Sequence, residues 1–220
     1  MKADFNLDTV LSRVSEAVAP FPKAAMFELA ERGYNSLFEQ LISCIISIRT
    51  LDEVSLPVSE RLFAIARTAE QLAQLTPDEL IPLLHGTTYP EQKAYTMLGI
   101  ANRAVAEFDG VLPADSETLI SLKGVGPKCA NLALGVATGQ AAISVDVHVH
   151  RVVNRWGLVQ ATQPEKTLKL LEKLVPQPQW IEINRLLMPF GKHICTGILP
   201  HCSTCPVLTW CEQVGVDRSR

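Results

Sequence analysis

The stretch from Leu122 to Lys128 constrains this chain most, because it predicts a sharp turn followed at once by a helix. It reads Leu-Lys-Gly-Val-Gly-Pro-Lys. Glycines at 124 and 126 let the backbone turn tightly and approach another molecule without a Cβ in the way. Pro127 suits the first position of a helix, where its fixed φ is already helical and its missing N–H costs no hydrogen bond.

Lys128 would lie in the first turn of that helix and is a candidate nucleophile. The positive end of the helix dipole disfavours an ammonium group there, and burial would add to this effect. Both would lower the lysine pKa and favour the neutral amine, which can attack an electrophile. An isolated Gly-x-Gly-x-Lys is more often only a turn followed by a solvated lysine, so the interpretation depends on the rest of the chain.

The rest of the chain supplies a family resemblance. The hairpin motif, Ala130-Asn131 and the segment Val145–Val152 (Val-Asp-Val-His-Val-x-Arg-Val) together resemble the helix-hairpin-helix DNA glycosylases, and among them the endonuclease III family. The resemblance covers nearly the whole chain. It places the family's catalytic lysine and aspartate on Lys128 and Asp146, with the family's spacing between them.

The resemblance implies a base-excision-repair DNA glycosylase with abasic-site lyase activity, which removes oxidised pyrimidines from damaged double-stranded DNA. Lys128 would attack C1′ of a flipped nucleotide, and the resulting Schiff base permits β-elimination. Asp146 would accept the lysine proton and stabilise positive charge on the sugar. Two alternatives stay open: a glycosylase for a mismatched or alkylated base, and a module that binds DNA damage without chemistry. The pairing of Lys128 with Asp146 disfavours the second, since binding alone needs neither.

Contacts with DNA are also implied by the resemblance. The backbone of Gly124, Val125 and Gly126 would hold a phosphate, which positions the protein without reading sequence. Lys123 stands where the family has proline, and either adds a phosphate contact or is simply exposed. Pro127 removes a backbone donor at the hairpin exit, which would weaken phosphate binding.

Two further positions correspond to the side chains that the family inserts into the opened helix. Arg49 stands where the family has glutamine, and an arginine there can still fill the gap and stack on bases. The alternative interpretation is that Arg49 is a surface arginine at the end of a helix. Tyr89 begins a second wedge loop that ends in Lys93-Ala94. The alternative interpretation is that Tyr89 is a buried loop residue. His148 would reach a phosphate or the base pocket, or make a structural hydrogen bond.

The net charge of −3 is unfavourable for binding nucleic acid, but the charges are unevenly distributed. Residues 120–160 hold four cations against Asp146 alone, which gives +3 and leaves −6 for the remainder. Those cations are Lys123, Lys128, Arg151 and Arg155. The positive charge therefore lies with the motif, and Arg151 is a further candidate for DNA binding.

Four of the six cysteines form the cluster Cys195-x6-Cys202-x2-Cys205-x5-Cys211. From chemistry alone, zinc and a [4Fe–4S] cluster are equally plausible, whereas two disulfides would need an oxidising compartment. The spacing resembles the endonuclease III signature for [4Fe–4S]. Its expected role is structural, because it would staple a tail with little apolar mass of its own.

The helical periodicity predicts a mainly helical chain, and the resemblance, which replaces its one strand-like stretch by a helix, implies an all-α fold. We expect helices near residues 6–18, 35–48, 76–84, 91–108, from 115, 162–175 and 179–190. Thr76 and Thr162 begin apparent capping boxes. Residues 143–150 alternate like a strand, but the resemblance makes Asp146 a helix cap.

By resemblance, two helical subdomains flank a DNA-binding cleft in which Lys128 and Asp146 face each other. A six-helix barrel with the helix-hairpin-helix would span 29–140, and an iron–sulfur subdomain 1–28 with 141–220. The N-terminus lacks the features of a signal peptide, and no apolar run approaches the ~18 residues that span a bilayer. We therefore expect a protein of the bacterial cytoplasm, associated with the nucleoid and not with a membrane. Nothing in the sequence indicates an oligomer, so we expect a monomer.

Overall fold

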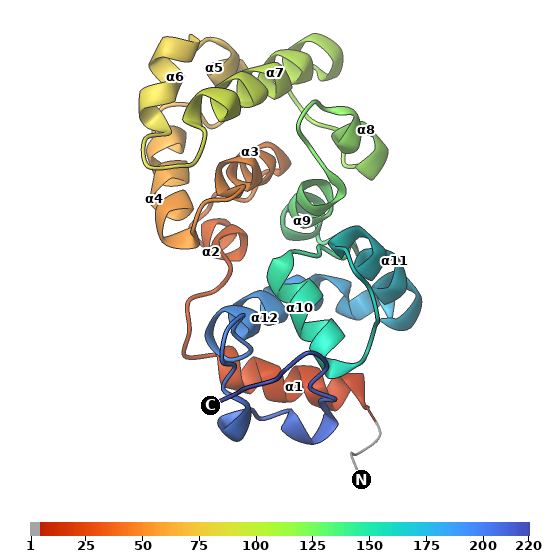
Figure 1. Ribbon diagram of the computed structural model, residues 1–220. Helices are drawn as coiled ribbons and strands as arrows, with labels where there is room; N and C mark the ends of the chain where they lie inside the picture. Colours follow the sequence, from red (N-terminus) through yellow and green to blue (C-terminus); the bar gives the residue numbers. More distant parts are fainter. Residues whose placement is uncertain (1–4) are drawn as a thin grey trace. The chain divides into compact units, whose positions relative to one another are not determined.

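The structure is a computed structural model that describes residues 5–220, so the first residues used above to exclude a signal peptide lie outside it. The described residues form helices and no strand (Figure 1). They divide into a central unit, Ala25–Gln140, and a terminal unit made of Ala141–Arg220 and the segment ending at Ala24. The central unit begins at Ala25 because Ala25, Met26 and Leu29 pack in its core, whereas the family's subdomain bounds of 29–140 stay a prediction.

The central unit is built around one buried helix. Its helices are α2 (Ala25–Glu31), α3 (Leu37–Ser47), α4 (Asp52–Phe63), α5 (Ala69–Ala73), α6 (Pro77–Leu83), α7 (Pro90–Phe108), α8 (Ser116–Ser121) and α9 (Pro127–Thr138). All nine residues from Phe38 to Ile46 are buried. Helices α2, α4, α7 and α9 pack around α3, which lies in the middle of this unit (Figure 1). A helix that is apolar on most of its circumference is stable only in such a position.

Local signals explain most of the helix boundaries. The capping box at Thr76 is confirmed, since its hydroxyl accepts from Glu79 N and the Glu79 side chain accepts from Thr76 N. Helices α2, α4 and α5 were not expected from the sequence. Helix α4 contains Pro57, and its N-cap Leu51 makes no side-chain capping bond; α5 has only five residues, although Thr68 and Gln71 form a capping box at its start. Short or proline-containing helices are marginal on their own, and these form through packing against the core.

The terminal unit contains α1 (Leu7–Val18), α10 (Val147–Trp156), α11 (Pro164–Leu174) and α12 (Trp180–His193), with 3₁₀ turns at Gln177–Gln179, Cys202–Thr204 and Leu208–Trp210. Helices α1 and α10 pack on α12. The core includes Val14, Val152, Trp156 and Phe190. Within residues 5–220, no helix is both long and apolar enough to cross a bilayer.

One local prediction in the chain needs correction. The capping box at Thr162 is wrong: Gln163 is the N-cap of α11 and its side chain makes no capping bond. The helix still begins at Pro164, because proline at the first position needs no N–H partner. Helix α7 ends at Phe108, the end that the sequence predicts, and Asp109 and Gly110 follow it with positive φ.

Candidate functional site

The expected hairpin joins α8 to α9 in the central unit. Val125 N donates to Leu122 O at 3.0 Å, and both side chains are buried, which anchors the turn. Gly124 has φ +88°, so its backbone conformation requires glycine, and a Cβ there would lie 2.7 Å from Thr96 Cγ2. Gly126 has φ −102° and caps α9. Only the first glycine is therefore demanded by the turn itself.

Lys128 is half-buried at the second position of α9, as the motif predicts. The next residue, Cys129, is buried with its Sγ 2.7 Å from Sγ of Cys44 on α3. The hydrogen bond with Cys44 and burial raise the pKa of Cys129 well above its ordinary value, and the nearby charge of Lys128 opposes this. The thiol beside the candidate nucleophile is therefore a protonated core group. A lowered pKa for Lys128 itself stays a prediction.

Asp146 is the N-cap of α10 in the terminal unit. Its Oδ1 accepts from His148 N at 2.9 Å and from Val149 N at 2.8 Å. Residues 147–150, which alternate like a strand in the sequence, therefore form the first turn of α10. Both capping bonds use the same carboxylate oxygen. The carboxylate that the motif singled out is thus fixed in direction by its own helix.

His148 and Arg151 belong to a network inside the terminal unit. Arg151 Nη2 lies 3.1 Å from His148 Nδ1 and donates to Gly191 O at 2.6 Å, while its Nε donates to Cys195 O at 3.1 Å. Burial lowers the pKa of Arg151, and the charges of Cys195 and Asp146 oppose this. The structure therefore gives Arg151 an internal linking role beside its predicted role in DNA binding.

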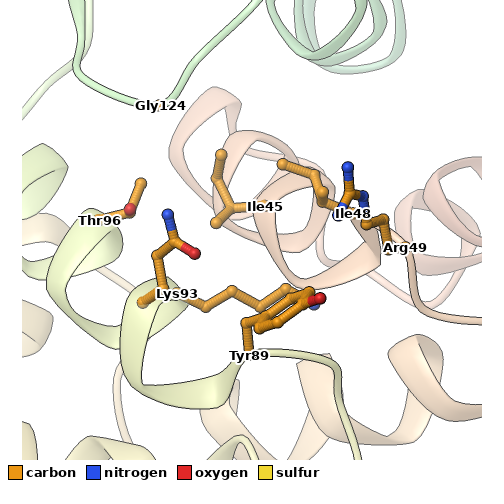
Figure 2. A pocket seen from close by; sticks show the side chains of 8 residues that line it. Ile45, Ile48, Arg49, Tyr89, Lys93, Thr96 and Gly124 are labelled. Carbon is orange, nitrogen blue, oxygen red and sulfur yellow. The ribbon is translucent and has the colours of Figure 1, made fainter.

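Arg49 and Tyr89 lie on the rim of one pocket in the central unit. The pocket has a volume of about 350 Å³. Its other lining residues are Ile45, Ile48, Gln92, Lys93, Thr96 and Gly124 (Figure 2). Tyr89 is 59% exposed, so the alternative of a buried loop tyrosine is wrong. Both rim residues have left-handed backbones, with φ 53° at Arg49 and 52° at Tyr89. The structure thus brings the two predicted wedge residues to one pocket, which also reaches the hairpin.

Lys93 is the residue of this region whose role the sequence did not reveal. It is only 6% exposed, and Nζ donates to Ile46 O at 2.7 Å and to Thr50 Oγ1 at 2.8 Å. Burial lowers the pKa of Lys93 to about 8. The Lys-Ala pair was visible in the sequence, but a lysine on an amphipathic helix is normally solvated, so nothing local indicated its burial.

The four clustered cysteines line a second cavity, in the terminal unit, together with Trp156 and Phe190. Burial raises the pKa of Cys205 to about 11; the Val207 N–H opposes this, and the other three thiols add to it. Among residues 5–220, no three His, Cys, Asp or Glu side chains are arranged to hold one metal ion. A polynuclear cluster instead takes its thiolates around a cavity, and this donor set fits that requirement. Arg155 Nη1 and Gln213 N lie 3.5 and 3.4 Å from Cys195 Sγ and Cys211 Sγ, as donors to cluster sulfurs do.

Known proteins with the same sequence pattern and fold are DNA repair enzymes. Residues 42–177 match the model of the HhH-GPD superfamily of base excision DNA repair proteins. Endonuclease III of Thermotoga maritima is 38% identical over 175 residues, which cover 80% of this chain and 82% of that protein. Among solved structures, a non-covalent endonuclease III–DNA complex has a TM-score of 0.83 at 26% identity, and a trapped covalent endonuclease III–DNA intermediate has 0.81 at 26%. Each match covers 94% of both chains.

Proposed function

We propose that this chain, which belongs to the HhH-GPD superfamily of base excision DNA repair proteins and is a DNA glycosylase, also cleaves the abasic site it creates. The observation that carries the proposal is Lys128 in the first turn of α9, directly after the glycine hairpin. A lysine there can form a covalent bond to C1′, which a glycosylase that activates water does not need. The match to a covalently trapped endonuclease III complex supports the same chemistry.

The reaction assigns one task to each side chain. Lys128 Nζ attacks C1′ of a nucleotide flipped from the stack, and the glycosidic bond breaks with its electron pair leaving on the base. Nζ then loses a proton, and opening of the sugar gives a Schiff base. Loss of a proton from C2′ expels the 3′ phosphate and nicks the strand. Asp146 accepts the lysine proton and faces the positive charge of the sugar.

Binding to duplex DNA is assigned to backbone and side chains around the motif. The hairpin of Gly124, Val125 and Gly126 holds a phosphate through its amides, with Lys123 adding charge. Arg49 and Tyr89 enter the helix beside the extruded nucleotide. Because Arg49 stands where the family has glutamine, the family's preference for the base opposite the lesion is not carried over to this enzyme.

A [4Fe–4S] cluster bound by Cys195, Cys202, Cys205 and Cys211 completes the proposal. Such a cluster would supply thiolate–iron bonds that tie the C-terminal segment to α10 and α12. The shared cavity of the four thiols and the N–H donors directed at two of them support this assignment. Oxidised pyrimidines in duplex DNA are the proposed substrate.

Borohydride trapping tests the lyase. The protein, Lys128→Ala and Asp146→Asn are incubated with duplexes that carry thymine glycol, 5,6-dihydrouracil, an abasic site, a mismatch or an alkylated base. We expect a covalent adduct with the oxidised pyrimidines and the abasic site that is absent in Lys128→Ala. Asparagine still caps a helix, so Asp146→Asn should fold normally and trap poorly. Base release without an adduct would make the enzyme monofunctional and refute the proposed lyase.

A further inference from the structure

Two exposed loops of the central unit hold side chains in an unfavourable backbone conformation. Arg49 follows α3 and Tyr89 precedes α7, and both have φ near +50°. Residues with a Cβ rarely adopt this left-handed region, and such strain persists only where the surrounding structure imposes it. Neither residue is glycine or asparagine, so local sequence preference does not explain the conformation. Some contact must hold each loop in place.

A hydrogen-bond network supplies that contact and joins the two loops. Thr88 Oγ1 lies 3.1 Å from Ile48 O, 3.2 Å from Arg49 O and 3.2 Å from Thr50 Oγ1. Thr88 N donates to Thr50 Oγ1 at 3.3 Å. The network therefore includes the carbonyl of Arg49 and the residue Thr88, which directly precedes Tyr89.

Lys93 lies beneath this network and bonds to both sides of it. Nζ reaches Ile46 O at the end of α3, Thr50 Oγ1 in the first loop and, at 3.4 Å, Thr88 Oγ1 in the second. Figure 2 shows Lys93 on α7, among the residues that line the pocket. The acceptors are a carbonyl and two hydroxyls, which carry no charge. A buried ammonium group is costly with neutral partners alone, so an apolar side chain would serve the packing better.

We propose that Lys93 is a positioning residue that locks the loops of Arg49 and Tyr89 into one rigid, two-pronged wedge on the rim of the pocket. This inference rests on the proposed function, in which these two side chains enter the DNA helix. With the loops fixed in advance, the strained backbones are imposed during folding instead of at the moment of DNA binding. Lys93 then acts on opening of the duplex and not on the reaction at C1′.

The test separates opening of the duplex from chemistry. Lys93→Met keeps an unbranched side chain of similar length and removes every donor, while Lys169→Met removes an exposed lysine from α11 as the control. A duplex with a tetrahydrofuran abasic analogue opposite 2-aminopurine reports insertion by fluorescence. This analogue cannot form a Schiff base, so insertion is measured even if the proposed lyase fails. Borohydride trapping is compared on duplex and single-stranded abasic DNA.

We expect Lys93→Met to abolish most of the 2-aminopurine signal and to slow trapping on duplex DNA by roughly ten- to a hundredfold. Trapping on single-stranded DNA should stay unchanged, as should every readout of Lys169→Met. In a variant that already carries Arg49→Ala and Tyr89→Ala, adding Lys93→Met should have no further effect. If Lys93→Met fails to fold, Thr88→Val and Thr50→Val each remove one link with little change of shape and should give the same pattern.

Three results would overturn the inference. The first is an unchanged fluorescence signal in folded Lys93→Met. The second is an equal loss of trapping on duplex and single-stranded DNA, which would mean a general disturbance of the site. The third is a further loss of the fluorescence signal or of duplex trapping when Lys93→Met is added to the variant that carries Arg49→Ala and Tyr89→Ala. A failure of wild-type trapping on all DNA, with the fluorescence pattern intact, would refute the proposed lyase and leave the role of Lys93 standing.

Discussion

Replacing each hairpin glycine by alanine should have opposite effects on stability, although the two positions are two residues apart. At Gly124 alanine must adopt φ +88°, which costs roughly 1–2 kcal/mol. Its Cβ would also lie 2.7 Å from Thr96 Cγ2, and relief of such a clash costs about 1–3 kcal/mol. We expect Gly124→Ala to lose about 3 kcal/mol of unfolding free energy. This is a large share of the roughly 5–15 kcal/mol that stabilises a domain.

Gly126 is the matched control. Its φ is −102° and no atom lies within 4 Å of an added Cβ. Alanine there restricts the unfolded chain and should leave stability unchanged or raise it by about 0.4–1 kcal/mol. If the hairpin amides approach a phosphate, the new methyl group should nevertheless weaken DNA binding. Gly126→Ala would then combine full stability with reduced affinity.

The assay must report on the central unit. Trp156, Trp180 and Trp210, the three tryptophans of the chain, belong to the terminal unit, so unfolding should be followed by far-UV circular dichroism in urea. Affinity for an abasic-analogue duplex is measured by anisotropy at fixed salt. Adding Thr96→Ser to Gly124→Ala removes the clashing methyl group. It should restore only the part of the unfolding free energy that the clash removes, because the positive φ remains. Equal stability of the two alanine variants, or no recovery with Thr96→Ser, would refute this reasoning.

Four further predictions follow from single contacts. Asp146→Ala should lose about 1 kcal/mol in thermal unfolding with the N-cap, which Asp146→Asn should retain; equal Tm values for the two would contradict the capping role. Cys129, whose pKa burial and Cys44 raise, should resist iodoacetamide at pH 8 until the protein unfolds, as mass spectrometry can show. Burial lowers the pKa of Lys93 to about 8, below the roughly 10.4 of an unfolded lysine. Between these two pH values the unfolded chain binds one proton more than the folded protein. The free energy of unfolding should therefore rise from pH 8 to about 10.4 in the wild type but not in Lys93→Met. Cys205→Ser should lose the visible absorption and the iron of the purified protein, whereas a colourless wild type with one zinc per chain would exclude the iron–sulfur assignment.

The sequence by itself determined those features that depend on neighbours along the chain. The turn at Gly124, the start of α9 at Pro127 and the capping box at Thr76 follow from backbone preferences of a few residues, and all three are present. The start of α10 shows the limit of such signals. Alternation at residues 143–150 favoured a strand, and the helix was expected only because of the family resemblance. The capping bonds of Asp146 give the physical reason for the helix.

The tertiary structure alone decided which polar groups are buried and what they contact. Lys93 has the same local appearance as a solvated helix lysine, yet packing of α7 against α3 directs Nζ at acceptors more than 40 residues away in the chain. Packing also places the Thr96 side chain against Gly124, where it leaves no room for a Cβ. Arg151 donates hydrogen bonds to the carbonyls of Gly191 and Cys195, near the cysteine cavity. Helix signals act over one or two turns, whereas these contacts join segments whose meeting depends on the packed core.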